Sequence, residues 1–149
     1  MSMNLEKMIC MLNDDLSNEY SHWHFYLNAA TRVVGLDRQE IQEYLLGEAA
    51  GEMKHVEEFK RLIIGLGGTP STTVASFCND LTDTHKILVE ALRMEDEVVH
   101  NYVHRIDDAC ELQSNGGTDK IHGKYIELFL EEQILASRAD ADHIREMVK

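Results

Sequence analysis

The sequence has only one proline and three cysteines among its 149 residues. Because proline interrupts helix interiors, a single proline at position 70 leaves room for long helices on either side of it. Cys10, Cys78 and Cys110 are odd in number and widely spaced, which fits neither a disulfide framework nor a CxxC metal-binding motif. Reduced thiols are the simplest explanation, so we expect a cytoplasmic protein.

Basic residues and long apolar runs are also scarce. The chain has 14 Lys and Arg against 27 Asp and Glu, a formal net charge of −13. Nucleic-acid binding normally needs a basic patch, so we expect no nucleic-acid partner, whereas an acidic surface attracts cations. No apolar run approaches the roughly 18 residues that span a bilayer, and residues 1–10 lack the apolar core of a signal peptide. We therefore expect no membrane association.

Apolar residues recur at steps of three and four over most of the chain, which predicts amphipathic helices. The predicted helices cover residues 4–34, 37–66, 81–113 and 118–149. Asp37 is the expected cap of the second helix, and Thr118 or Asp119 is the expected cap of the fourth. In the fourth helix, Ile121 and Tyr125 belong to the apolar stripe that we expect to face the core.

The connection over residues 67–81 is too long for a tight turn between neighbouring helices. It has the length of a crossover that runs from one end of a bundle to the other. The other two connections are short and rich in glycine, so the helices on either side of them should be antiparallel. The sequence therefore predicts one all-α domain over residues 1–149, an up-down-down-up four-helix bundle with the crossover between helices two and three.

Each predicted stripe is interrupted near its middle by an acidic residue. The interruptions are Glu19, Glu52 with His55 three residues later, Glu95, and the run Glu131-Glu132-Gln133. A single glutamate could reach water at the edge of a stripe, but mid-helix positions of four helices meet inside a bundle. Buried carboxylates without partners cost several kcal/mol each. A shared metal site removes that cost, and oxygen-rich ligands with one imidazole suit iron or manganese better than structural zinc.

These residues resemble the ferritin family over nearly the whole chain. The segment 12–20 resembles the first-helix segment that carries a ferroxidase glutamate, and the segment 51–55 is similar to the second-helix motif of bacterioferritins. The resemblance implies that Glu52 bridges two irons and that Tyr26 lies beside them. It implies an iron-binding set of Glu19, Glu52, His55 and Glu95.

The fourth helix departs from the bacterioferritin and rubrerythrin pattern, which repeats Glu-x-x-His there. Glu132 is followed three residues later by Leu135, and Gln133 by Ala136. The resemblance to animal heavy-chain ferritins favours Gln133 beside the second metal, with Glu132 as the alternative. A second metal without a histidine would be held more loosely, which suits iron that passes through to a store. The acid-x-x-His spacing within residues 140–143 lies too near the chain end to meet the other ligands.

The resemblance also implies a function and partners. We expect a ferroxidase that oxidises Fe(II) with O2 or H2O2 and stores Fe(III) in a homo-oligomeric cage of 24 or 12 chains, or a smaller assembly. The sequence ends at Lys149, without the fifth helix of classical ferritins, so the shell size stays open. Met53 occupies the position that binds haem in bacterioferritins, but related non-haem ferritins also carry methionine there, so an exposed or interfacial methionine without haem is the alternative. The alternatives are a non-storing, rubrerythrin-like di-metal oxidase or peroxidase and a DNA-protecting mini-ferritin.

Overall fold

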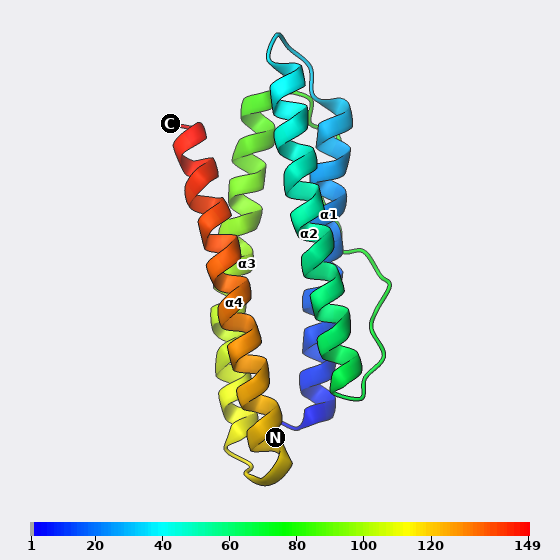
Figure 1. Cartoon of the computed structure of the whole chain (residues 1–149), viewed down its shortest axis with the longest axis vertical. Coiled ribbons are helices and arrows are strands. Elements are labelled where there is room, and N and C mark those ends of the chain that lie inside the picture. The colour runs from blue at the N-terminus through cyan, green and yellow to red at the C-terminus, as the bar shows by residue number, and fades with distance from the viewer. Residues whose placement is uncertain (1) are drawn as a thin grey trace.

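The computed structural model describes residues 2–149 and consists of four long helices. They are α1 (Leu5–Arg32), α2 (Arg38–Gly65), α3 (Thr84–Gln113) and α4 (Gly117–Met147). Figure 1 shows α1 and α4 running in one direction along the long axis and α2 and α3 running in the other. The predicted up-down-down-up all-α bundle is therefore confirmed. None of the helices in residues 2–149 combines the length and the apolar character that a membrane span needs.

Side-chain caps begin two of the helices. Asn4 accepts a hydrogen bond from the backbone N–H of Lys7 at 2.8 Å and caps α1. Asp83 accepts from the N–H of Lys86 at 3.0 Å and caps α3, which begins three residues later than the sequence predicted. Both caps satisfy backbone donors that have no partner inside the helix.

The predicted N-cap of α2 is confirmed in position, whereas the predicted cap of α4 was wrong. Asp37 precedes α2, but its side chain makes no capping hydrogen bond. Helix α4 begins at Gly117, ahead of Thr118 and Asp119, and its N-cap residue is Gly116. Gly116 and Gly117 have φ angles of +73° and +57°, a left-handed conformation that glycine adopts without strain. The backbone of these two glycines makes the turn.

The crossover over residues 66–83 runs along α1 from one end of the bundle to the other (Figure 1). Asn13 fastens its beginning by donating to the carbonyl of Thr69 at 3.0 Å and accepting from the N–H of Ser71 at 2.7 Å. Asn28 fastens its end by donating to the carbonyl of Asn79 at 2.8 Å. The polar face of α1 therefore holds the long connection along the bundle. The predicted course of the crossover is confirmed.

The helices pair into two hairpins, which we call the first hairpin (α1 and α2) and the second hairpin (α3 and α4). Packing is closest within each hairpin, and α1 also contacts α3. Between the hairpins lie two apolar clusters, one on each side of a polar layer. Leu16, Phe59, Tyr102 and Leu130 represent the first cluster. Phe25, Leu45, Ile87 and Ile144 represent the second.

The buried face of α4 differs from the predicted one near its beginning. Ile121 is 69% exposed and Tyr125 is 55% exposed, so neither belongs to the core. The buried stripe instead starts at Gly123 and continues through Ile126 and Leu130. A Cβ atom at position 123 would lie 2.6 Å from the carbonyl oxygen of Ala109, so this glycine allows α3 and α4 to approach closely. That contact sets the rotation of α4.

Candidate metal centre

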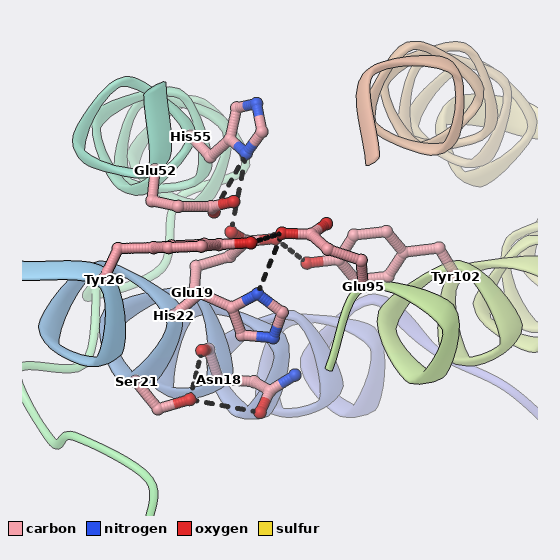
Figure 2. A network of polar contacts seen from close by, with 9 residues as sticks. All are labelled: Asn18, Glu19, Ser21, His22, Tyr26, Glu52, His55, Glu95 and Tyr102. Atoms are coloured by element: carbon pink, nitrogen blue, oxygen red, sulfur yellow. Dashed lines mark hydrogen bonds and ion pairs between the residues drawn. The ribbon is translucent and has the colours of Figure 1, made fainter. Parts of the chain in front are cut away.

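The polar layer at mid-bundle is built from three glutamates and two histidines. Glu19, His22, Glu52 and Glu95 are at most 2% exposed, and His55 is 9% exposed. In Figure 2 their side chains converge from α1, α2 and α3, with His55 on one side of the carboxylates and His22 on the other. Burial of this many ionisable groups together is expensive unless they neutralise one another or share a cation.

The five side chains form two overlapping triads. Glu19, Glu52 and His55 offer ligand atoms that all lie within 4.8 Å of one another, and so do His22, Glu52 and Glu95. His55 Nδ1 lies 3.2 Å from Glu52 Oε2 and 3.6 Å from Glu19 Oε2. His22 Nδ1 lies 3.7 Å from Glu95 Oε1. Glu52 belongs to both triads, which is the position of a bridging ligand between two ions.

His22 is the residue that the sequence reasoning missed, although its signal is in the sequence. Glu19 and His22 are three residues apart on α1, the same spacing as Glu52 and His55 on α2. This spacing places both side chains on one face of a helix. The family pattern places the second Glu-x-x-His on α4, whereas this chain carries a second buried pair on α1. The expectation that the second metal position lacks a histidine stays untested, but His22 offers an imidazole to the second triad.

Two tyrosines connect the hairpins through the glutamates. The hydroxyl of Tyr26 on α1 donates to Glu95 Oε1 on α3 at 2.9 Å. In the reverse direction, the hydroxyl of Tyr102 on α3 donates to Glu19 Oε1 on α1. Figure 2 shows both contacts within the layer. Each hydroxyl fixes the orientation of one carboxylate and leaves the other oxygen of that carboxylate free to bind.

Those remaining oxygens are suited to a cation. Glu19 Oε2 and Glu95 Oε2 are buried and accept no hydrogen bond. Buried acceptors without a partner are rare because they lose hydration without compensation. Two divalent ions would place positive charge beside these oxygens, with oxygen and imidazole ligands of the kind that iron and manganese accept. The residues present therefore fit a pair of such ions.

Proton sharing balances the charge of the cluster in the absence of metal. Burial and the neighbouring charge of Glu19 raise the pKa of Glu52 well above its usual range. Burial also acts to raise the pKa of Glu19, but the nearby imidazole of His55 and the charge of His22 outweigh burial and lower that pKa. The carboxylates in turn raise the pKa of His55 against the effect of burial. Protonated imidazoles thus supply the positive charge that bound cations would replace.

Helix α4 brings no glutamate into the cluster. Gln133 is 3% exposed and points inward, and its Oε1 is buried without a hydrogen-bond partner. Glu132 and Glu131 lie on the exposed face of α4, so the alternative that Glu132 faces the second metal does not fit the structure. Met53, next to Glu52 in sequence, is 52% exposed on the outer face of α2. It lies outside the cluster.

Asp140 lies nearer the cluster than its position in the sequence suggested. It is partly buried, and burial together with the charge of Glu95 raises its pKa to about 6. Glu48 on α2 is its neighbour, and burial followed by the charge of Asp140 raises the pKa of Glu48 to about 7. Asp140 comes near the cluster because the C-terminal part of α4 lies level with Glu95 on α3. The ion pair between Arg145 and Asp96, at 2.8 Å, fixes this alignment. These two acids form the rim of the polar layer.

Comparisons with known proteins agree with this geometry. A family model described as a ferritin-like domain matches residues 9–145. A solved structure of a ferritin-like, diiron-carboxylate protein from Bacillus anthracis str. Ames is 25% identical, covers 100% of both chains and superposes with a TM-score of 0.84. A bacterioferritin from Rhodobacter capsulatus is 16% identical over 99% of this chain and 86% of that chain, with a TM-score of 0.78.

A third solved structure shares the fold at lower sequence identity. The Dps protein from Vibrio cholerae O1 is 13% identical over 100% of this chain and 98% of that chain, with a TM-score of 0.83. No curated protein sequence matches the chain. Because the family model covers most of the sequence and the fold is a four-helix bundle around a carboxylate–histidine cluster, this chain belongs to the family of ferritin-like domains.

Proposed function

We propose that this protein oxidises Fe(II) to Fe(III) at the cluster of Glu19, His22, Glu52, His55 and Glu95. The observation that carries the proposal is the sharing of Glu52 between two triads within one chain. Two Fe(II) ions held side by side can each give one electron to the same oxidant. Three carboxylates favour the product because hard oxygen ligands stabilise Fe(III) more than Fe(II).

The reaction is balanced by a two-electron oxidant. Two Fe(II) ions and two protons reduce O2 to H2O2, or reduce H2O2 to two waters, and two Fe(III) ions result. The protein positions the ions and keeps the site enclosed between the two apolar clusters. Tyr26 and Tyr102 hold the Glu95 and Glu19 carboxylates in their binding orientation. The net charge of −13 draws cations toward the protein.

Substitution of the shared ligand tests this function. We expect Glu52→Ala to slow aerobic Fe(II) oxidation by at least about 100-fold, measured from the absorbance of Fe(III), because both triads lose a ligand. Glu43→Ala is the matched control, since Glu43 is an exposed glutamate on the same helix. Equal rates for Glu52→Ala and the unmodified protein, with the fold preserved by circular dichroism, would exclude the cluster as the oxidation site.

Storage of the product in a homo-oligomeric cage is the second part of the proposal. His22 also favours a second candidate, a rubrerythrin-like di-metal oxidase that keeps its ions, because each triad then has an imidazole. Size-exclusion chromatography after Fe(II) loading in air separates the two. A large assembly with many irons per chain indicates storage. A small oligomer that retains two irons per chain through chelation indicates the non-storing enzyme.

A further inference from the structure

A pair of histidines on the outer face of α3 lies apart from the buried cluster. His100 and His104 are both exposed, and their Nε2 atoms are 3.2 Å apart. The ring centroids are 4.6 Å apart, with an angle of 76° between the ring planes. The buried face of the same helix carries Glu95, Val98 and Tyr102. The histidine pair therefore belongs to the solvent-facing side of α3 and plays no part in the proposed oxidation site.

The distance between the two nitrogens matches a two-imidazole chelate. With metal–nitrogen bonds of about 2.0–2.1 Å, two nitrogens 3.2 Å apart subtend an angle of about 100° at the ion. That angle lies between the values for octahedral and tetrahedral coordination. The four-residue spacing on a helix supplies this arrangement without rearrangement of the backbone. The two nitrogens thus already lie at the separation that a chelate needs.

Without a metal, the two rings can form only one hydrogen bond with each other. A neutral imidazole has one N–H donor and one acceptor nitrogen, so one Nε2 must be protonated for the pair to form a hydrogen bond. A divalent ion would replace that single proton and accept electron pairs from both nitrogens. The remaining coordination positions face solvent and would hold water.

The electrostatic surroundings favour a cation at this place. His104 lines a surface hollow together with Asp14 and Asp15 of α1. The cation nearest in sequence, Arg105, is already engaged by Asp15 through contacts of 2.8 and 3.0 Å and by Asp108 at 3.0 Å. The basic charge beside the pair is therefore neutralised, and the chain as a whole carries a net charge of −13.

We propose that His100 and His104 form a surface site for one late first-row divalent ion, of the class of Zn2+, Ni2+ or Cu2+. Imidazole is a borderline ligand that binds these ions more strongly than Fe2+, following the general order of divalent metal affinities. The site would therefore distinguish these metals from the iron that the buried carboxylates are suited to hold. It does not depend on the proposed oxidation of Fe(II).

Retention of the tag-free protein on immobilised Ni2+ tests the site selectively, because an ion fixed to a resin cannot enter the buried cluster. We expect His100→Ala and His104→Ala each to elute at an imidazole concentration at least about tenfold lower than the unmodified protein, since each leaves a single ligand. His85→Ala removes an isolated exposed histidine from the same helix and should elute like the unmodified protein. All three positions are exposed, so the fold should be preserved.

A Zn2+ titration by calorimetry provides the second measurement. The unmodified protein should bind one more Zn2+ per chain than His100→Ala or His104→Ala, while His85→Ala should match the unmodified protein. Equal elution and equal stoichiometry across all variants would mean that the pair is only a hydrogen bond between imidazoles, and would overturn the proposal. A loss of retention in His85→Ala as large as in the other two would overturn it as well.

Discussion

The two hairpins are alike in helix length but unequal in the ligands that they bring to the polar layer. The first hairpin carries both buried Glu-x-x-His pairs, Glu19 with His22 and Glu52 with His55. The second hairpin adds only Glu95 to the two triads. The proposed binding of metal would therefore depend mainly on α1 and α2. The second hairpin closes the site and supplies the carboxylate that completes the second triad.

The hydrogen bonds across the layer are more evenly divided. Each hairpin sends one tyrosine hydroxyl to a glutamate of the other, Tyr26 to Glu95 and Tyr102 to Glu19. The unequal ligand sets are therefore joined by a reciprocal pair of contacts. The first hairpin supplies most of the candidate ligands, but both hairpins orient them. Ligand supply and ligand orientation can therefore be tested separately.

The strongest test of the unequal division is His22→Ala. We expect it to slow Fe(II) oxidation by about 100-fold, as much as His55→Ala, because each triad loses its only imidazole. The measurement is the initial rate of Fe(III) formation in air. His24→Ala is the control, since His24 lies on the same helix but stacks against Phe77. An unmodified rate for His22→Ala beside a slow His55→Ala would mean that the second hairpin supplies the missing ligand.

The reciprocal tyrosines should contribute nearly equally to stability. We expect Tyr26→Phe and Tyr102→Phe each to lower the free energy of unfolding of the metal-free protein by about 2 kcal/mol, because each removes a hydrogen bond to a buried carboxylate. Urea denaturation followed by circular dichroism measures the change. Tyr125→Phe, at a position that is 55% exposed, should leave stability unchanged. A large loss for only one of the two buried tyrosines would contradict the reciprocity.

Substitution of Gln133 tests whether α4 takes part in the proposed metal site or only packs against the other helices. We expect Gln133→Leu to raise the free energy of unfolding by about 1 kcal/mol, because a buried amide oxygen without a partner is replaced by an apolar group of similar size. The rate of Fe(II) oxidation should change less than it does in His22→Ala. Gln39→Leu, on the exposed face of α2, is the control for stability. A loss of oxidation as large as that of His22→Ala would assign Gln133 to the second metal.

The smallest expected effect is the pH dependence of stability that arises from Glu48 at the rim of the polar layer. Burial and the charge of Asp140 raise the pKa of Glu48 from 4.5 to about 7. The folded protein therefore holds this proton to higher pH than the unfolded chain, so the stability that Glu48 contributes falls as pH rises from about 4.5 to about 7. Because Glu48 is partly exposed, we expect a loss of only about 1 kcal/mol.

Urea midpoints of the metal-free protein at pH 5 and pH 8 measure this effect. The difference between the two pH values should be smaller in Glu48→Gln than in the unmodified protein. Glu43→Gln, at an exposed position on the same helix, should behave like the unmodified protein. The same pH dependence in Glu48→Gln would show that another group is responsible.

Much of the architecture followed from the sequence because helical periodicity and glycine-rich turns are local signals. The four helices and the long crossover were predicted within a few residues. The same periodicity placed Glu19, Glu52 and Glu95 on buried faces at mid-helix, where the structure brings them together. His22 has the same local signal, because it follows Glu19 by three residues on α1, whereas the family pattern places the second histidine on α4.

The register between helices could not be predicted in this way. Periodicity defines which face of a helix is buried, but it does not define how far one helix slides along its neighbour. The close contact of Gly123 with Ala109 and the ion pair between Arg145 and Asp96 fix that register for α3 and α4. Asp140 therefore reaches the level of Glu95, although its position in the sequence placed it far from the mid-helix ligands.

Each of the two apolar clusters draws side chains from all four helices. Neither hairpin thus has a core of its own, and a nascent chain cannot complete either cluster until the crossover has brought α3 beside α1. Folding should be cooperative as a result, because formation of one cluster aligns the helices for the other. The five ligands would then assemble in the same event as the core. The triad of Glu19, Glu52 and His55 lies wholly on the first hairpin, and only the arrival of the second hairpin would enclose it away from solvent.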